Sequence, residues 1–143
     1  MAADRTANVT WSGSLMDGSG KIESVGSGAF GPLDVTWASR TEESGGRTSP
    51  EELIAAAHGS CFSMALSHAL AEAGSPPERL ETSATVTFVP GTGITKSALT
   101  VRGTVPGMDD AAFREAAEGA KQNCPVSKAL AAVPEITLDA SLV

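Results

Sequence analysis

Short runs of alternating apolar and polar residues dominate the first part of the chain. The alternation holds at 7–11 and again at 33–37, and a period of two is typical of strands that bury one face. Between these runs, the stretch DGSG at 17–20 has the composition of a hairpin turn and leads into a further short strand. We therefore predict three short antiparallel strands within residues 6–38, and the polar, glycine-rich stretch 42–49 is expected to be a loop.

Signals for the start of a long helix coincide at residue 49. Ser49 is a suitable N-cap, Pro50 fits the first helical position because its missing N–H costs nothing there, and Glu52 stands where a capping box requires an acidic residue. The helix is expected to run to about residue 73, because Gly74 can adopt the left-handed conformation and two prolines follow shortly after it.

The remainder of the chain returns to strands and then to helices. The expected elements are, in order, strands at 84–88 and 99–105 around a turn at 90–93, a helix from Asp109 to about 122, a short helix from Cys124-Pro125 and a strand at 136–142. The order is βββα followed by ββααβ. Because strands come in consecutive runs, this order favours an α+β fold with antiparallel sheets packed on a long central helix. Residues 1–143 are expected to form one domain.

The middle of the long helix is unusual in composition. Its 19 residues from 53 to 71 include no Asp, Glu, Lys or Arg, so its length alone would allow a membrane span. A glycine, three serines and two histidines make it only moderately apolar, however, and its start is that of a soluble helix. A helix without a charged face must be surrounded by protein, and one layer of sheet would leave a side exposed. We therefore predict a homodimer in which a second copy covers this helix.

Composition narrows the classes of function. The chain has 143 residues and a net charge of −7, with no run of Lys or Arg, so it repels phosphate backbones and anionic lipids. The N-terminus lacks the apolar segment of a secretory signal, and we expect a cytoplasmic protein. A chain of this length needs no metal or disulfide in order to fold. Its two cysteines are therefore expected to be a buried thiol or a redox pair.

The positions of the two cysteines leave alternatives open. Cys61 lies in the middle of the charge-free helix, where it is either a small buried hydrophobe or a functional thiol. Cys124 precedes Pro125 and takes the N-cap position of a short helix, which favours a thiolate, although a cysteine is also tolerated there as a plain cap. The two could form a disulfide if the fold brings their Cα atoms within about 6 Å.

Several motifs together resemble a known family. They are SPEELIAAAHGSCFSMALS at 49–67, ITK at 94–96, CPVSK at 124–128 and EITLD at 135–139. With this combination, the chain closely resembles the OsmC/Ohr family of thiol-dependent organic hydroperoxide reductases over essentially its whole length. The absence of Arg from the first hairpin is typical of the OsmC branch. The resemblance implies an intertwined OsmC-like homodimer.

The same resemblance implies a two-cysteine peroxidase of the stress response. Cys61 would be the peroxidatic thiolate that attacks the O–O bond, and Cys124 would capture the resulting sulfenic acid as a disulfide. Arg40 matches the active-site Arg of the OsmC branch, and Glu51 matches the carboxylate that holds it. The family further implies alkyl or lipid-derived hydroperoxides as substrates, an external dihydrolipoyl-type dithiol as reductant, and no cofactor or metal.

Taken without the family, these residues have plainer interpretations. Arg40 could be a solvated residue at the end of a strand, and Glu51 an ordinary first-turn acid favoured by the helix dipole. Arg47 is a rival for the guanidinium role, because the loop before Pro50 is one residue longer than the family leads us to expect. His58, one helical turn before Cys61, either tunes the thiolate or is a hydrogen-bonded interior histidine.

Helix geometry adds a prediction about the assembly. Ten residues of helix advance about 15 Å, so Glu51 cannot reach the Cys61 of its own chain along a straight helix. We therefore predict two composite sites per dimer, each with Cys61, Cys124 and Arg40 of one chain and Glu51 of its partner. The small residues at 55–57, with Gly59 beside them, would allow two antiparallel helices to cross closely.

Three other classes of function compete with the peroxidase. A thiol hydrolase would use Cys61 with His58 or His68 held against its sulfur. A small-molecule binding module would leave both thiols inert. A zinc site would have to draw on His58, Cys61, His68 and Cys124, which are scattered and lack C-x-x-C spacing.

Overall fold

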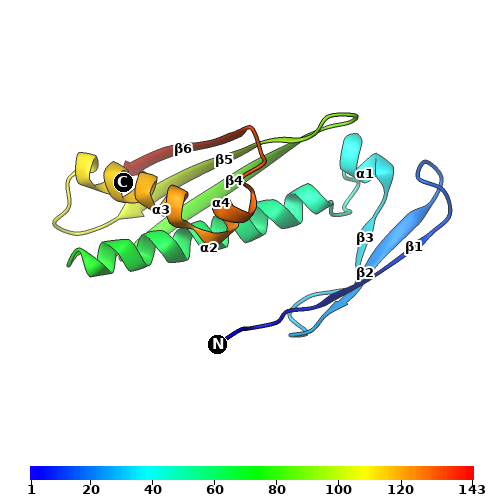
Figure 1. The fold of residues 1–143 in the computed structure, drawn as a ribbon, viewed down its shortest axis with the longest axis horizontal. Coiled ribbons are helices and arrows are strands. Elements are labelled where there is room, and N and C mark those ends of the chain that lie inside the picture. The colour runs from blue at the N-terminus through cyan, green and yellow to red at the C-terminus, as the bar shows by residue number, and fades with distance from the viewer. The chain divides into compact units, whose positions relative to one another are not determined.

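The computed structural model describes residues 1–143 and divides into two compact units, Met1–Leu53 and Ile54–Val143 (Figure 1). The first unit contains β1 (Ala7–Ser12), β2 (Ser19–Val25) and β3 (Leu33–Val35), in the order β1-β2-β3 with antiparallel pairing throughout. The three predicted strands are therefore confirmed.

A short helix, α1 (Trp37–Thr41), follows β3 where the sequence pattern had continued the strand. Thr36 ends the extended segment by acting as an N-cap: its hydroxyl accepts from the Ser39 N–H at 3.0 Å, and the Ser39 hydroxyl accepts from the Thr36 N–H at 2.9 Å. This reciprocal capping box outweighs the alternation of apolar residues. The prediction that Trp37 belongs to a strand was wrong.

Strand β1 is solvent-exposed along its whole length, contrary to the expectation that one of its faces is buried. The side chains that the pattern would place inside include Val9, 60% exposed, and Trp11, 43% exposed. The sheet of the first unit thus does not bury these apolar side chains itself.

The long helix α2 (Pro50–Glu72) begins and ends where the sequence predicted. The Ser49 hydroxyl accepts from the Glu52 N–H at 3.2 Å, but the Glu52 carboxylate accepts from the Thr48 hydroxyl at 3.0 Å, so only half of the expected capping box forms. At the other end, Gly74 has a φ of +85°, and the helix stops in a left-handed turn.

The sheet of the second unit consists of β4 (Arg79–Val89), β5 (Gly93–Thr104) and β6 (Glu135–Leu142), in the order β4-β5-β6. β4 and β5 pair antiparallel, as predicted, whereas β5 and β6 pair parallel. The expectation of purely antiparallel sheets is corrected here. α3 (Asp110–Asn123) and α4 (Pro125–Ala129) carry the chain back across the sheet, and such a crossover leads to a parallel neighbour (Figure 1).

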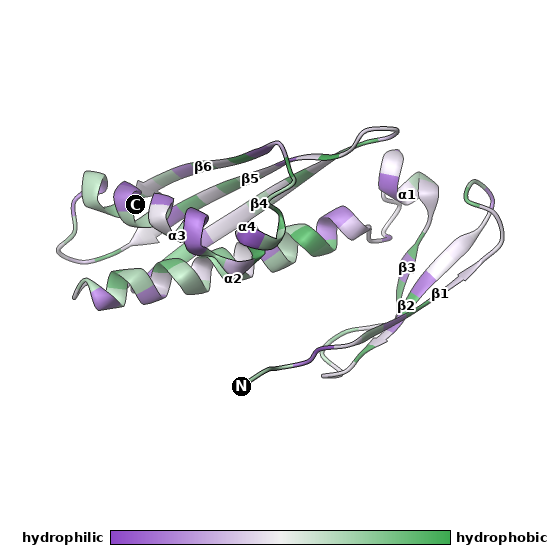
Figure 2. Ribbon diagram, in the orientation of Figure 1, coloured by the Kyte–Doolittle hydropathy of each residue, from purple (hydrophilic) through white to green (hydrophobic).

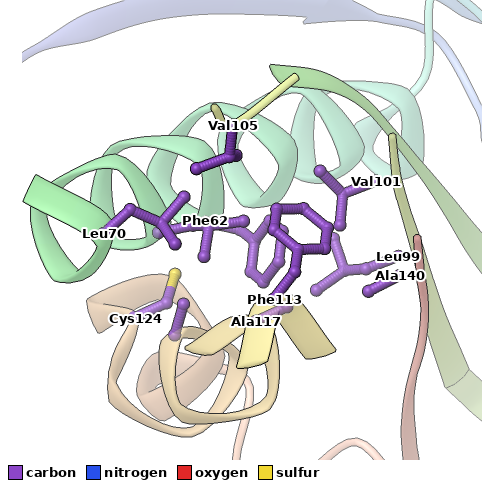
Figure 3. Packing of buried hydrophobic residues seen from close by; sticks show 11 residues of the cluster. Phe62, Leu70, Leu99, Val101, Val105, Phe113, Ala117, Cys124 and Ala140 are labelled. Carbon is purple, nitrogen blue, oxygen red and sulfur yellow. The ribbon is translucent and has the colours of Figure 1, made fainter. Parts of the chain in front are cut away.

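The core of the second unit lies between α2, α3 and the sheet (Figure 3). Its fully buried large side chains are Phe62, Leu66 and Leu70 of α2, Leu99 and Val101 of β5, and Phe113 of α3. Helix α3 starts as predicted, with the Asp109 carboxylate accepting from the Ala112 N–H at 2.8 Å. Since α3 packs on this core and ends directly before Cys124, the core fixes the position of that cysteine.

Only one face of α2 is buried in the single chain. The buried residues recur every fourth position, at His58, Phe62, Leu66 and Leu70, whereas Met64 on the opposite face is 69% exposed. Figure 2 shows largely hydrophobic colouring along this helix, and with a mean hydropathy of 1.3 it is the one helix long and apolar enough to pass a length-and-composition test for a membrane span. The buried apolar residues of α2 belong to the hydrophobic core of the second unit. A second copy covering the other face stays a prediction.

Gly59 of α2 faces the chain's own strand β4. A Cβ built on it would lie 3.9 Å from the side chains of Ala84 and Thr82 on β4. These are ordinary van der Waals distances, so an alanine would fit here and the approach of α2 to its own sheet does not require Gly59; a role of Gly59 in a crossing of two helices stays a prediction.

Candidate active site

The two cysteines lie side by side in the second unit. Cys61 of α2 and Cys124 approach to 3.1 Å, although 63 positions separate them in the sequence. Both are free thiols; Cys124 is fully buried and Cys61 half-buried. The prediction that the fold makes neighbours of these two residues is confirmed.

Cys124 is held between two helices. Its backbone N–H donates to the Ala120 carbonyl at 2.8 Å, which ends α3, and the residue is also the N-cap of α4, with Pro125 at the first helical position. This is the N-cap position that the sequence predicted. Figure 3 shows the Cys124 side chain directed from the end of α3 towards α2. The junction of two helices therefore aims the thiol at the helix that carries Cys61.

The pKa values of the two thiols are shifted in opposite directions. Burial raises the pKa of Cys61, and its hydrogen bond to Cys124 raises it further. Burial also acts to raise the pKa of Cys124, but interactions with the Ser127 backbone N–H, the Cys61 thiol, the Val126 N–H and the Ser127 hydroxyl together outweigh it and lower this pKa below its ordinary value. Of the two thiols, Cys124 is therefore the more readily ionised, and Cys61 is the donor in the hydrogen bond between them.

His58 is a fully buried, hydrogen-bonded residue. Its Nδ1 lies 2.7 Å from the Ser97 hydroxyl and its Nε2 lies 2.8 Å from the Ser127 hydroxyl. Burial lowers the pKa of this histidine and favours the neutral ring. Because both ring nitrogens bond to serines, His58 is not the base of a Cys–His pair, and the interpretation as an interior histidine is confirmed.

The sequence analysis missed Ser97 and Ser127. A signal was available for Ser127, which lies three residues after the predicted N-cap Cys124, the spacing at which a capping interaction is expected. No comparable signal marks Ser97, because its contact with His58 spans 39 positions of the sequence. His68, the other histidine of α2, is exposed and lines an open groove with Met64 and Arg79.

Arg40 and Glu51 form an ion pair in the first unit. The Arg40 Nη2 donates to one oxygen of Glu51 at 2.7 Å, and Nε donates to both oxygens at 3.0 and 3.1 Å. The guanidinium also lies 5.9 Å from the centre of the Trp37 ring, a cation–π distance. The Glu51 side chain is only 8% exposed, whereas that of Arg40 is 29% exposed.

This pairing corrects the predicted distribution of the site between subunits. The prediction had taken Arg40 from one chain and Glu51 from its partner, but the two bond to each other within one chain. The Glu51 carboxylate is engaged by Arg40 and not by Arg47, and the role of Arg40 as the active-site guanidinium stays a prediction. The four predicted site residues thus come together as two pairs, Arg40 with Glu51 and Cys61 with Cys124. No group of three or more His, Cys, Asp or Glu side chains is arranged to hold a metal ion.

Comparison with known proteins identifies the class. An organic hydroperoxide resistance protein from Elizabethkingia anophelis has a similar structure, with a TM-score of 0.71 at 23% identity, and the match covers 100% of both chains. The organic hydroperoxide resistance protein OhrB of Bacillus subtilis matches with a TM-score of 0.64 at 24% identity, over 96% of this chain and 98% of that one. The fold is therefore that of OsmC/Ohr proteins.

The sequence comparisons are more specific. Residues 43–139 match the family described as OsmC-like protein. The chain is also 41% identical to the peroxiredoxin OsmC of Escherichia coli (strain K12) over 145 residues, which cover 99% of each chain, and equally similar to the protein of that name from Shigella flexneri. The chain belongs to the OsmC family, as its motifs predicted.

Proposed function

We propose that this protein is a peroxidase that reduces organic hydroperoxides with its two cysteines. The observation that carries the proposal is the approach of Cys61 and Cys124 to 3.1 Å as free thiols. Its relatives support the substrate class, since they are named as a peroxiredoxin and as organic hydroperoxide resistance proteins. The two-cysteine route follows from thiol chemistry.

The reaction runs in two steps. The Cys61 thiolate attacks a peroxide oxygen, the O–O bond breaks, and the alkoxide takes a proton and leaves as the alcohol, so that Cys61 becomes a sulfenic acid. The Cys124 thiolate then attacks the Cys61 sulfur; the S–S bond forms, the S–O bond breaks, and hydroxide leaves as water after taking a proton. The two electrons lost by the thiols reduce the peroxide. An external dithiol of the dihydrolipoyl type, which the family resemblance implies, reduces the disulfide by thiol–disulfide exchange.

The ion pair supplies the positive charge that the first step needs. Burial and the neighbouring Cys124 raise the pKa of Cys61, which disfavours the thiolate, whereas a guanidinium beside a thiol favours it. We assign this role to Arg40, which Glu51 holds in a fixed orientation through three hydrogen bonds. Since Glu51 lies ten residues before Cys61 on α2, an advance of about 15 Å, we propose that the Arg40–Glu51 pair of one chain serves the cysteines of a second copy in a homodimer.

Mixing inactive variants tests the shared site. Glu51→Ala chains retain the cysteines and Cys61→Ser chains retain the ion pair, so a heterodimer has one complete site. An equal mixture should regain about a quarter of wild-type activity if subunits exchange at random, because half of the dimers are mixed and each has one of two sites. Sites built within one chain would leave this mixture inactive despite exchange.

The matched control is a mixture of Arg40→Ala and Glu51→Ala. If both residues of the pair come from the same chain, neither chain of this heterodimer has a complete pair, and the mixture should stay inactive. Recovery here would support the earlier arrangement, with Arg40 and Glu51 from different chains, and would refute ours.

Counting free thiols tests the reaction itself. One equivalent of an organic hydroperoxide should remove both thiols from the reduced protein, and dithiothreitol should restore both. Retention of both thiols would refute the peroxidase and favour an inert binding module or a hydrolase. The stretch 53–71 of α2, which has no charged side chain, supports an apolar alkyl or lipid-derived hydroperoxide in preference to hydrogen peroxide, and the same assay with each peroxide measures that preference. A cytoplasmic, reducing location fits the two free thiols and belongs to the proposal.

A further inference from the structure

A chain of buried polar side chains leads through the core to Cys124. His58 of α2 and Ser97 of β5 are 0% exposed, and Ser127 of α4 is 7% exposed. The imidazole bridges the two serines, 2.7 Å from the Ser97 hydroxyl and 2.8 Å from the Ser127 hydroxyl. The mechanism described above uses none of these three residues.

The donors in this chain depend on one another. A neutral imidazole has one N–H and one bare nitrogen, so it donates to one serine and accepts from the other. If Nε2 carries the proton, it donates to the Ser127 oxygen, and the Ser127 hydroxyl hydrogen is free to point elsewhere. With the opposite tautomer, the Ser127 hydroxyl would itself donate to Nε2 and would be lost to any other acceptor. When the Ser97 hydroxyl donates to Nδ1, the proton of the neutral ring is on Nε2, so Ser97 selects the first of these two tautomers.

The acceptor available to Ser127 is the sulfur of Cys124. Ser127 lies three residues after Cys124, on the single turn of α4, so its side chain stands on the same side of the helix as that sulfur, and the hydroxyl favours the charged form of the thiol. The Cys61 thiol of α2 hydrogen-bonds this sulfur. Two side chains therefore favour the charged form of Cys124: the thiol of its reaction partner Cys61 and the hydroxyl of Ser127, which His58 holds.

We propose that His58 is a positioning residue for the resolving cysteine: through the chain Ser97–His58–Ser127, it keeps the Ser127 hydroxyl as a donor to the Cys124 sulfur. The inference rests on the proposed function only in naming Cys124 as the resolving thiol. It has a consequence for the second step, because a Cys124 already held as a thiolate attacks the Cys61 sulfenic acid without first losing a proton. Loss of this Ser97–His58–Ser127 chain should therefore slow disulfide formation without slowing the first oxidation.

The direct test measures Cys124 alone. In a Cys61→Ser background, the ultraviolet absorbance of the thiolate is followed against pH, with the Cys61→Ser/Cys124→Ser protein as blank. Adding Ser127→Ala or His58→Leu should raise the titration midpoint of Cys124 by about one pH unit, a tenfold loss of thiolate at a given pH. The two substitutions combined should raise it no further, because they break the same chain.

Two variants separate positioning from a structural role. His58→Gln places an amide donor near Ser127 and should keep the midpoint near that of the background protein. His68→Gln removes the exposed histidine of the same helix and should leave the midpoint unchanged. Ser97→Ala, which leaves His58 in place but removes the hydroxyl on Nδ1, carries the test if His58→Leu does not fold. An unchanged midpoint in folded Ser127→Ala, or a midpoint that His58→Gln shifts as much as His58→Leu does, would overturn the proposal.

A second measurement follows the reaction in chains with both cysteines. Ser127→Ala should consume the first equivalent of hydroperoxide at least as fast as the wild type, while a sulfenic acid that dimedone can trap accumulates. The titration uses no peroxide, so the two proposals fail separately. A shifted midpoint in a protein that never consumes hydroperoxide would refute the peroxidase and uphold the positioning role, whereas normal disulfide formation in Ser127→Ala would refute that role.

Discussion

Replacement of Gly103 by Ala should strain the core that positions Cys124. Gly103 lies in β5, and a Cβ added to it would stand 2.6 Å from Cε1 and Cζ of Phe113 and 3.3 Å from Cδ2 of Leu80. Carbon atoms pack best at about 3.5–4.0 Å, so the ring would have to move by about 1 Å. Phe113 is 0% exposed and has no open space to enter. Overpacking of this kind costs about 1–3 kcal/mol, and since two ring atoms clash, we expect about 2 kcal/mol.

Urea unfolding of the reduced protein, at one protein concentration for all variants, measures this cost. In a separate thermal unfolding experiment, the same loss of about 2 kcal/mol should lower the melting temperature by about 6 °C in a chain of this size. Phe113→Leu should relieve the clash, so that Gly103→Ala costs under about 1 kcal/mol in that background. Gly119 is the control: it lies in α3, nothing is within 4 Å of a Cβ added to it, and Gly119→Ala should stabilise by about 0.5–1 kcal/mol. A Gly103→Ala protein as stable as the wild type would refute this account of the core.

Three further substitutions have defined outcomes. Leu66→Ala removes a fully buried side chain and should cost about 2–5 kcal/mol in the same unfolding assay. Glu51→Gln removes the carboxylate that pairs with the Arg40 guanidinium. Because the Arg40 side chain is 29% exposed, the free energy of unfolding should fall by about 1–2 kcal/mol, less than the 3–5 kcal/mol expected for a fully buried pair. Peroxide turnover should fall as well. Burial lowers the pKa of His58 from 6.5, so below about pH 6.5 the unfolded chain binds a proton that the folded chain does not bind. The free energy of unfolding of the wild type should therefore fall relative to that of His58→Gln between about pH 6.5 and 5.5, by up to about 1.4 kcal/mol per pH unit. Equal pH dependence in the two proteins would contradict this assignment.

The elements that sequence reasoning located correctly are those with local signals. Ser49, Gly74 and Asp109 mark helix ends through contacts with residues a few positions away, and all three act in the structure as predicted. The wrong predictions of secondary structure and strand pairing concern places where a specific contact or the path of the chain outweighs the local hydrophobic pattern. Trp37 continues an alternating run, yet the capping box of Thr36 turns the chain into a helix. The parallel pairing of β5 with β6 depends on the path of α3 and α4 over the sheet, which no local pattern encodes.

The candidate site divides in the same way. The sequence motifs predicted four site residues, Cys61, Cys124, Arg40 and Glu51, and in the structure they form two pairs. The family pattern specifies residue types at positions, but it does not say which chain supplies each one, so the prediction separated Arg40 from Glu51. The serines that bond His58 were missed because Ser is common and its role here depends on a buried neighbour 39 or 69 positions away.

The proton shared by the two thiols leads to a last prediction, for Cys124→Ser. The Cys124 thiolate accepts the hydrogen bond of Cys61 and, as a neighbouring negative charge, opposes a second thiolate beside it; both effects, after burial, raise the pKa of Cys61. A serine hydroxyl stays neutral, so the pKa of Cys61 should fall in this variant. At neutral pH its first oxidation should then be at least as fast as in the wild type, but the reaction should stop at a sulfenic acid, because no thiol is present to resolve it. Rapid-mixing measurement of hydroperoxide loss, with dimedone to trap the product, tests both statements. A Cys124→Ser protein whose first oxidation is tenfold slower would mean that Cys124 helps to ionise Cys61, and the assigned direction of the shared proton would be wrong.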